Sequence, residues 1–148
     1  MREVKRSALI AEPPARMYRL INDVERYPEF VPGIVATRIE SRSPGEVVAT
    51  LSIKRGPLRA DLTTRNLLEP DRRVLMQLVK GPFRVLEGLW TLTPLGDLGC
   101  RVELEMRFEF ANRVTGALME PLFEDTAASL VDAFVRRARE QPGPPDMS

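Results

Sequence analysis

Apolar and charged residues alternate strictly over positions 101–110 of the chain. An alternation with a period of two predicts an antiparallel strand that has one covered face and one face in water. Weaker versions of the same alternation run through positions 47–53 and 62–68. The chain is therefore expected to build a sheet from strands with a dry and a wet face. In the clearest strand the dry positions are Val102, Leu104, Met106, Phe108 and Phe110.

Prolines divide the middle of the chain at nearly regular intervals, at positions 44, 57, 70, 82 and 94. The runs between them are rich in Val, Leu, Ile and Thr, and the pairs Pro44-Gly45, Pro70-Asp71 and Gly81-Pro82 are typical of turns. This spacing predicts a meander of about six antiparallel strands. One further strand is expected near the amino end.

Two segments with helical periodicity bracket the strands. Pro13 and Pro14 suit the start of a helix that ends before Pro28. A much longer helix is expected after Asn112, which suits the N-cap position, and Pro121 inside it predicts a bend. The apolar stripe of the long helix is expected to contain Val114, Leu118, Leu122, Leu130, Val131, Phe134 and Ala138.

A sheet with one solvent-exposed face must bury its other, apolar face against another element. The long carboxyl-terminal helix is the only expected element of sufficient length. The fold class is therefore expected to be α+β, with the sheet curved around that helix. Gly88 falls on the apolar face two residues before Trp90, the only tryptophan, and leaves a gap there. The pattern leaves two uses of the space open, a filled core and a ligand cavity.

Composition excludes several kinds of site. The chain has no histidine and one cysteine, Cys100, which removes disulfides, zinc sites of the Cys/His type and histidine-dependent catalysis. Lys and Arg total 22 against 21 for Asp and Glu, so the net charge creates no general attraction for nucleic acid. The apolar run near the amino end, Ala8 to Ala11, is shorter than the apolar segment of a signal peptide. We expect a cytoplasmic monomer with one domain at 1–140 and a disordered tail at 141–148.

Four segments resemble the START-like, helix-grip superfamily, also called Bet v 1-like: YPEFVPG at 27–33, TTRN at 63–66, GPFRVLEGLWTLTPL at 81–95 and FEFAN at 108–112. Within it, residues 2–140 resemble the coenzyme Q-binding branch, which includes ribosome association toxins of the RatA type. The resemblance implies a curved antiparallel sheet of about seven strands around a long carboxyl-terminal helix, with two short helices after the first strand. It also implies a deep apolar cavity that binds a lipid or a polyprenyl quinone.

The candidate ligand-contacting residues combine strand parity with this resemblance. Tyr27, Phe30 and Val31 form an apolar cluster between prolines that is expected to cover the cavity mouth, or else to plug the core as an ordinary turn. Thr64 and Asn66 are polar groups that a dry core leaves in need of partners, such as a quinone carbonyl or a water. The other candidates are Leu62, Phe83, Leu86, Gly88, Trp90, Leu104, Met106, Phe108, Leu118, Leu122 and Phe123.

The leading hypothesis is non-enzymatic binding of a polyprenyl quinone or other lipid, in support of respiratory quinone function. It requires no cofactor or metal. It allows transient contact with the inner membrane. An enzyme of the polyketide cyclase or dehydratase kind ranks third, because Cys100 has no identified base and the available carboxylates are expected at the surface. Those carboxylates are Asp61, Glu87, Glu120 and Glu124.

The runner-up hypothesis follows from the RatA resemblance, which implies binding to the large ribosomal subunit and a block of subunit association. Such binding requires a basic surface patch that meets RNA phosphates. No basic motif interleaved with aromatic residues is present, so the patch would have to come from scattered arginines. The candidates are Arg55, Arg59, Arg72, Arg73, Arg136, Arg137 and Arg139.

Overall fold

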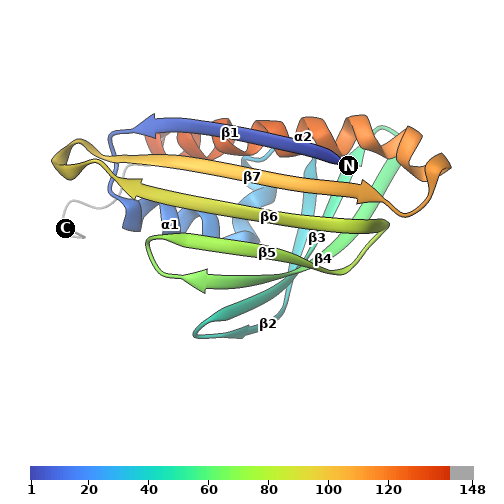
Figure 1. The fold of residues 1–148 in the computed structure, drawn as a ribbon, viewed down its shortest axis with the longest axis horizontal. Coiled ribbons are helices and arrows are strands. Elements are labelled where there is room, and N and C mark those ends of the chain that lie inside the picture. Colours follow the sequence, from blue (N-terminus) through green and yellow to red (C-terminus); the bar gives the residue numbers. More distant parts are fainter. Residues whose placement is uncertain (141–148) are drawn as a thin grey trace.

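The computed structural model describes residues 1–140, which form one seven-stranded antiparallel sheet and a long helix (Figure 1). The predicted disordered tail at 141–148 lies outside the described residues. The elements in chain order are β1 (Arg2–Ile10), α1 (Pro14–Asn22), the 3₁₀ helix η1 (Val24–Glu29), β2 (Ile34–Ser43), β3 (Glu46–Arg55), β4 (Leu58–Glu69), β5 (Arg73–Lys80), β6 (Phe83–Pro94), the 3₁₀ turn η2 (Gly96–Leu98), β7 (Cys100–Phe110) and α2 (Arg113–Glu140).

The strands are ordered β1-β7-β6-β5-β4-β3-β2 across the sheet. Strands β2 to β7 form the predicted meander, and β7 returns beside β1, so α1 and η1 carry the chain from one edge to the other. The sheet curves so that α2 lies against one face, behind β1 and β7 in the view of Figure 1. This is the helix-grip arrangement expected from the sequence.

Strand parity sets the contents of the concave face. In β6 the side chains of Leu86, Trp90 and Leu92 are buried together with Gly88, as the alternation predicted. Trp90 is opposite Leu104 on β7, and Gly88 is opposite Met106. The apolar rows of β6 and β7 therefore form one continuous wall beneath α2.

Local sequence explains where the helices begin. Pro14 is the first residue of α1, where its missing N–H is no loss. The side-chain oxygen of Asn112 accepts hydrogen bonds from the backbone N–H groups of Val114 at 2.8 Å and Thr115 at 3.2 Å. The predicted N-cap of α2 is thus confirmed. Helix α1 ends at Asn22, and Pro28 falls within η1.

The predicted apolar stripe of α2 is wrong in its first turns. Val114 is 72% exposed and Leu118 is 57% exposed, so Leu118 is not a cavity residue. The helix instead turns Gly116 toward the sheet, where a Cβ atom would lie 3.2 Å from Cβ of Phe110. The backbone of α2 approaches β7 so closely here that only a small residue such as Gly116 fits. Hydrophobicity alone had placed the face with Leu118 against the sheet.

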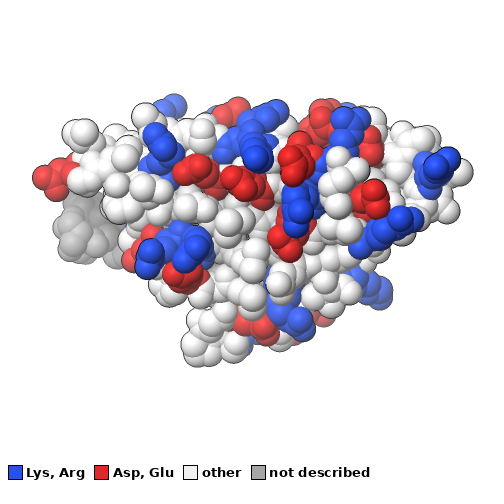
Figure 2. Space-filling model, in the orientation of Figure 1, with Lys and Arg blue, Asp and Glu red and all other residues white. Residues whose placement is uncertain are grey.

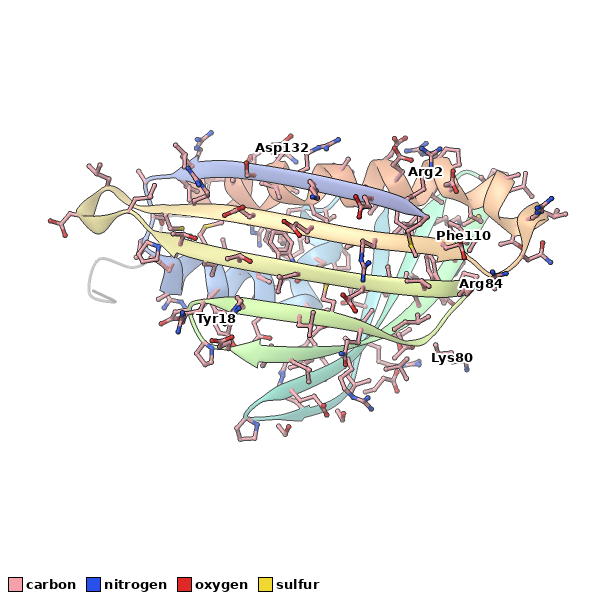
Figure 3. The ribbon with its side chains drawn as sticks, viewed as in Figure 1. Arg2, Tyr18, Lys80, Arg84, Phe110 and Asp132 are labelled. Carbon is pink, nitrogen blue, oxygen red and sulfur yellow. The ribbon has the colours of Figure 1, made fainter. Side chains whose placement is uncertain are left out.

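Basic and acidic side chains are interleaved over the face of the molecule seen in Figure 2. Many form pairs across neighbouring elements, such as Arg107 of β7 with Glu87 of β6 at 3.3 Å. Figure 3 shows Arg2 beside the amino-terminal part of α2, where it pairs with Glu120 at 2.8 Å. Exposed pairs of this kind contribute little stability each. No helix within residues 1–140 is long and apolar enough to cross a membrane.

Candidate functional site

A cavity of about 60 Å³ lies between the concave face of the sheet and α2. Its wall is apolar apart from Tyr27 and two threonines, one on the sheet and one on the helix. The sheet contributes Ile34, Leu51, Ile53, Leu62, Thr64, Met76, Leu86, Gly88, Trp90 and Met106, while η1 contributes Tyr27 and α2 contributes Phe123, Thr126, Ala127 and Leu130.

The volume decides what the cavity holds as it stands. Sites for drug-sized ligands usually measure about 300–1,000 Å³, whereas one water needs roughly 10–15 Å³. At about 60 Å³ the cavity is closer to a few waters than to a lipid. Apolar cavities of this size usually stay dry. A larger ligand therefore requires side chains of the wall to move.

The gap over Gly88 is occupied by a side chain of the neighbouring strand β5, that of Met76, and not by a side chain of α2. Met76 on β5 and Met106 on β7 flank Gly88 in the register of the sheet. A Cβ atom on Gly88 would lie 2.4 Å from Cε of Met76 and 3.4 Å from Cε of Met106. Methionine side chains are unbranched and adopt many shapes, so this part of the wall is its most deformable part.

Tyr27 of η1 forms part of the cavity wall. The Tyr27 hydroxyl donates a hydrogen bond to the backbone carbonyl of Ile21, and its ring packs edge to face on Phe134 of α2 at 5.2 Å between centroids. Burial, with a smaller effect of the Asp23 charge, holds the pKa of Tyr27 well above its usual value. Tyr27 is therefore neutral. Phe30 and Val31 lie behind it and do not line the cavity.

The two polar residues predicted on the concave face satisfy each other. The hydroxyl of Thr64 donates a hydrogen bond to the side-chain oxygen of Asn66 at 3.0 Å, and both side chains are buried. Thr64 lines the cavity and Asn66 does not. Thr126 lies on the helix side of the same cavity. The Thr126 hydroxyl is thus left as a donor for a ligand, while the Thr64 hydroxyl can only accept a hydrogen bond.

The structure brings eight of the sixteen predicted residues to the cavity wall and places seven in the adjacent core or beside it. Leu118, the remaining residue, points outward, which corrects the prediction. The wall contains Tyr27, Leu62, Thr64, Leu86, Gly88, Trp90, Met106 and Phe123, and the other group contains Phe30, Val31, Asn66, Phe83, Leu104, Phe108 and Leu122.

Seven further wall residues were not predicted from the sequence. Met76 could have been found from the hairpin that joins β5 to β6, because its register places Met76 opposite Gly88. Thr126 gave no signal, because a threonine within a helix is more often a surface residue. The remaining missed residues are Ile34, Leu51, Ile53, Ala127 and Leu130.

The cavity wall contains no carboxylate, lysine or cysteine side chain. Tyr27 is the only titratable side chain in its wall. Asp61 is exposed and pairs with Arg59, and Glu87 is exposed and pairs with Arg107. Cys100 is buried, and burial raises the pKa of its thiol, which favours the inert form. Within residues 1–140, no three acidic or cysteine side chains are grouped to hold a metal ion.

The arginines predicted to form one RNA-binding patch do not all lie together. Arg55 and Arg59 flank the turn between β3 and β4, whereas Arg72 and Arg73 lie at the other end of β4, which is 12 residues long. A strand of that length spans about 40 Å. Arg55 and Arg73 also pair with carboxylates, with Asp125 at 2.9 Å and Glu69 at 2.9 Å.

Residues 10–135 match the family described as polyketide cyclase / dehydrase and lipid transport. The chain is 39% identical over 140 residues to the ribosome association toxin RatA of Escherichia coli K12, covering 95% of this chain and 89% of the toxin. It is 27% identical over 135 residues to the mitochondrial coenzyme Q-binding protein COQ10 of Drosophila melanogaster, covering 88% and 56%. The crystal structure of the Zhui aromatase/cyclase from Streptomyces sp. R1128 superimposes with a TM-score of 0.80 at 18% identity, covering 95% and 96%.

Proposed function

Because the chain belongs to the polyketide cyclase/dehydrase and lipid transport family, we propose that it is a non-enzymatic protein that binds a hydrophobic ligand between the sheet and α2. The observation that carries this proposal is the cavity wall, which is apolar and contains one neutral tyrosine as its only titratable side chain. Binding an apolar molecule needs such a wall and one or two polar groups for orientation. Cyclase or dehydratase chemistry needs a proton carrier, and the wall offers only Tyr27, whose hydroxyl proton is donated to the backbone carbonyl of Ile21.

A polyprenyl quinone or a similar lipid is the ligand class we infer. Thr126 supplies the wall hydroxyl that can donate to a carbonyl acceptor, whereas the Thr64 hydroxyl already donates its proton to Asn66 and can only accept. The similarity to the coenzyme Q-binding protein of Drosophila supports the same class. Since the cavity measures only about 60 Å³, the ligand must displace flexible wall side chains, and Met76 and Met106 are the ones suited to this.

The side of the cavity near β2 and β3 offers the entry route that we infer. There the α2 residue Thr126 packs closely on Gly33, where a Cβ atom would lie 2.7 Å from the Thr126 hydroxyl oxygen, so this contact must part when a ligand enters. Arg55 at the end of β3 reaches across to Asp125 of α2, with the two charged groups 2.9 Å apart and both exposed. An exposed ion pair is worth roughly 0–1 kcal/mol, so this link opens at low cost.

We expect protein purified from bacterial cells to carry an extractable quinone or other lipid. Mass spectrometry of organic extracts measures this directly, with extracts of an unrelated protein purified in the same way as the control. Trp90 lines the cavity and is the only tryptophan, so its fluorescence should also change when a short-chain quinone is added. Empty extracts together with unchanged fluorescence would refute ligand binding.

Association with the large ribosomal subunit is the second candidate function. It is favoured by the 39% identity over 140 residues to the ribosome association toxin of Escherichia coli. The expected result is co-sedimentation with large subunits at low salt, and a steep loss of binding as salt rises, because phosphate contacts dominate such complexes. Absence of co-sedimentation at low salt rejects this candidate and leaves the ligand proposal intact.

A further inference from the structure

A second pocket, unlike the apolar cavity, is lined by arginines. It has a volume of about 180 Å³ and lies where α1 and η1 meet the carboxyl-terminal part of α2. We call it the arginine pocket. Its lining consists of Arg16, Arg19, Arg26 and Arg137 together with Leu20, Asp23 and Phe30.

Arg137 is held firmly at this pocket. The residue is only 9% exposed, although it lies in the last turns of α2. Its Nη2 atom donates a hydrogen bond to Oε1 of Glu29 at 2.6 Å, and its guanidinium carbon lies 5.0 Å from the centre of the Phe30 ring. An arginine fixed by a carboxylate and an aromatic face is already oriented before any ligand arrives.

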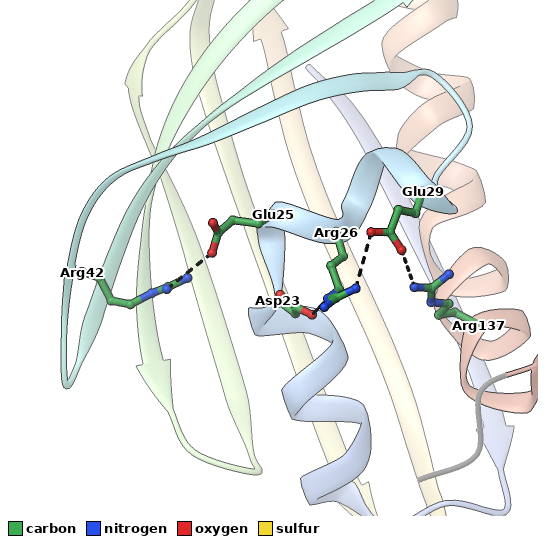
Figure 4. Close-up of polar contacts among 6 residues, drawn as sticks. All are labelled: Asp23, Glu25, Arg26, Glu29, Arg42 and Arg137. Atoms are coloured by element: carbon green, nitrogen blue, oxygen red, sulfur yellow. Dashed lines mark hydrogen bonds and ion pairs between the residues drawn. The ribbon is translucent and has the colours of Figure 1, made fainter. Parts of the chain in front are cut away.

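The neighbouring charges form a chain of contacts that Figure 4 shows. Arg26 lies between Asp23, at 3.1 Å, and Glu29, at 3.5 Å, and Glu29 in turn contacts Arg137. The carboxylate of Glu29 is shared between Arg26 and Arg137, and the carboxylate of Asp23 is partly exposed. The guanidinium groups therefore keep donors that these two carboxylates do not use.

Two arginines of α1 add donors with few protein partners. Arg16 pairs through Nε with Glu12 at 3.3 Å, but its Nη2 atom is buried and has no hydrogen-bond partner. A buried donor without a partner costs free energy, and an acceptor in the pocket would recover it if the Arg16 side chain turns this atom toward the pocket. Arg19, three residues further along the helix, is exposed and forms no ion pair within residues 1–140.

The charge balance favours an anion. Four guanidinium groups line the pocket, and Glu12, Asp23 and Glu29 offset three of these charges, so 4 − 3 leaves one net positive charge. The volume of about 180 Å³ exceeds what a single halide fills. Arginine forks match the paired oxygens of a phosphate, which also accepts several donors at once.

We propose that the arginine pocket binds the phosphate end of a small phosphorylated molecule. A small molecule suits the site better than RNA, because Arg137 is buried at the pocket and a polymer backbone meets exposed side chains first. The site is separate from the apolar cavity. Phe134 stands between them, with its ring 5.1 Å from Phe30 on one side and 5.1 Å from Trp90 on the other. The proposal therefore does not depend on a hydrophobic ligand.

Isothermal titration calorimetry with sodium pyrophosphate and the full chain at low ionic strength tests this proposal. The unmodified protein should show saturable binding. Arg19→Ala should weaken it about tenfold or more, because one charged hydrogen-bond donor is lost without loss of a protein contact. Arg113→Ala is the matched control, since it removes an equally exposed charge at the far end of α2 and should leave binding unchanged.

Arg137→Lys gives an independent check that keeps the charge and removes the fork. It should weaken pyrophosphate binding while the protein still melts cooperatively. Absence of binding to the unmodified protein overturns the proposal, as does equal weakening by Arg113→Ala, which means general charge attraction. A third outcome also overturns the proposal. In it, the protein binds an RNA oligonucleotide without terminal phosphates but not pyrophosphate, and Arg19→Ala abolishes the RNA binding. The arginines would then form an RNA contact.

Discussion

Replacing Phe134 with alanine is expected to lower the free energy of unfolding by about 3–5 kcal/mol. Phe134 is fully buried, and its ring packs edge to face on Tyr27, Phe30 and Trp90 at centroid distances of 5.2, 5.1 and 5.1 Å. Such contacts add to the area that each ring buries. Removing the ring takes away the one side chain that joins α2, η1 and β6 at this point.

Thermal and denaturant unfolding of purified protein measure this loss. For a chain of 148 residues, a loss of this size lowers the melting temperature by roughly 10 °C. Leu118→Ala is the matched control, because it truncates a large apolar residue on the same helix that is 57% exposed. It should change stability by about 0.5 kcal/mol or less. Similar losses in both variants would contradict the observed packing of α2.

Trp90 belongs to the same aromatic group and also lines the cavity. Because the cavity measures only about 60 Å³, most of the ring is packed against protein atoms. The sequence left open whether Trp90 faces a filled core or a ligand. The structure places it at the boundary of both, so changes at Trp90 mix stability with binding, whereas changes at Phe134 report on packing alone.

Strand parity was predictable because one buried face imposes a period of two on every residue of a strand. The alternation in β7 and the buried row of β6 are two results of that constraint. The helix boundaries were also predictable at Pro14 and Asn112, where each residue has a local chemical reason for its position. The order of elements followed from turn residues together with the recognised segments.

The rotation of α2 was not predictable from hydrophobicity. Gly116 faces the sheet and Leu118 faces outward, because the distance between helix and strand decides which residue fits. The arginine pocket was missed for the same kind of reason. In the sequence Arg137 was only one of the scattered arginines proposed for an RNA-binding patch, and only the position of η1 shows that Glu29 and Phe30 contact it.

The size of the cavity depends on contacts between strands, which the alternation within a single strand does not show. Gly88 signals a gap, but the residue that enters the gap comes from the adjacent strand. Met76 was not a candidate, because its own strand has no clear alternation. The position of the Met76 side chain over Gly88 therefore determines how much free volume the apolar cavity has for a ligand.

Gly88→Ala is expected to abolish binding of a short-chain quinone, or weaken it at least about tenfold, with little loss of stability. The new Cβ atom lies 2.4 Å from Cε of Met76, so the end of that flexible side chain must shift. Both residues line the cavity, and the adjacent free space is the cavity itself. The added methyl group and the shifted end of Met76 take up part of the roughly 60 Å³ that a ligand would first occupy.

Met76→Ala is expected to act in the opposite direction, because it enlarges the cavity beside Gly88. It should tighten quinone binding, measured by Trp90 fluorescence, while it lowers the free energy of unfolding by about 2 kcal/mol, the lower end for a methionine that is half-buried. Leu75→Ala is the matched control, because adjacent residues of a strand point to opposite faces, and it should leave binding unchanged. Unaltered binding in both Gly88→Ala and Met76→Ala would show that the ligand does not lie over Gly88.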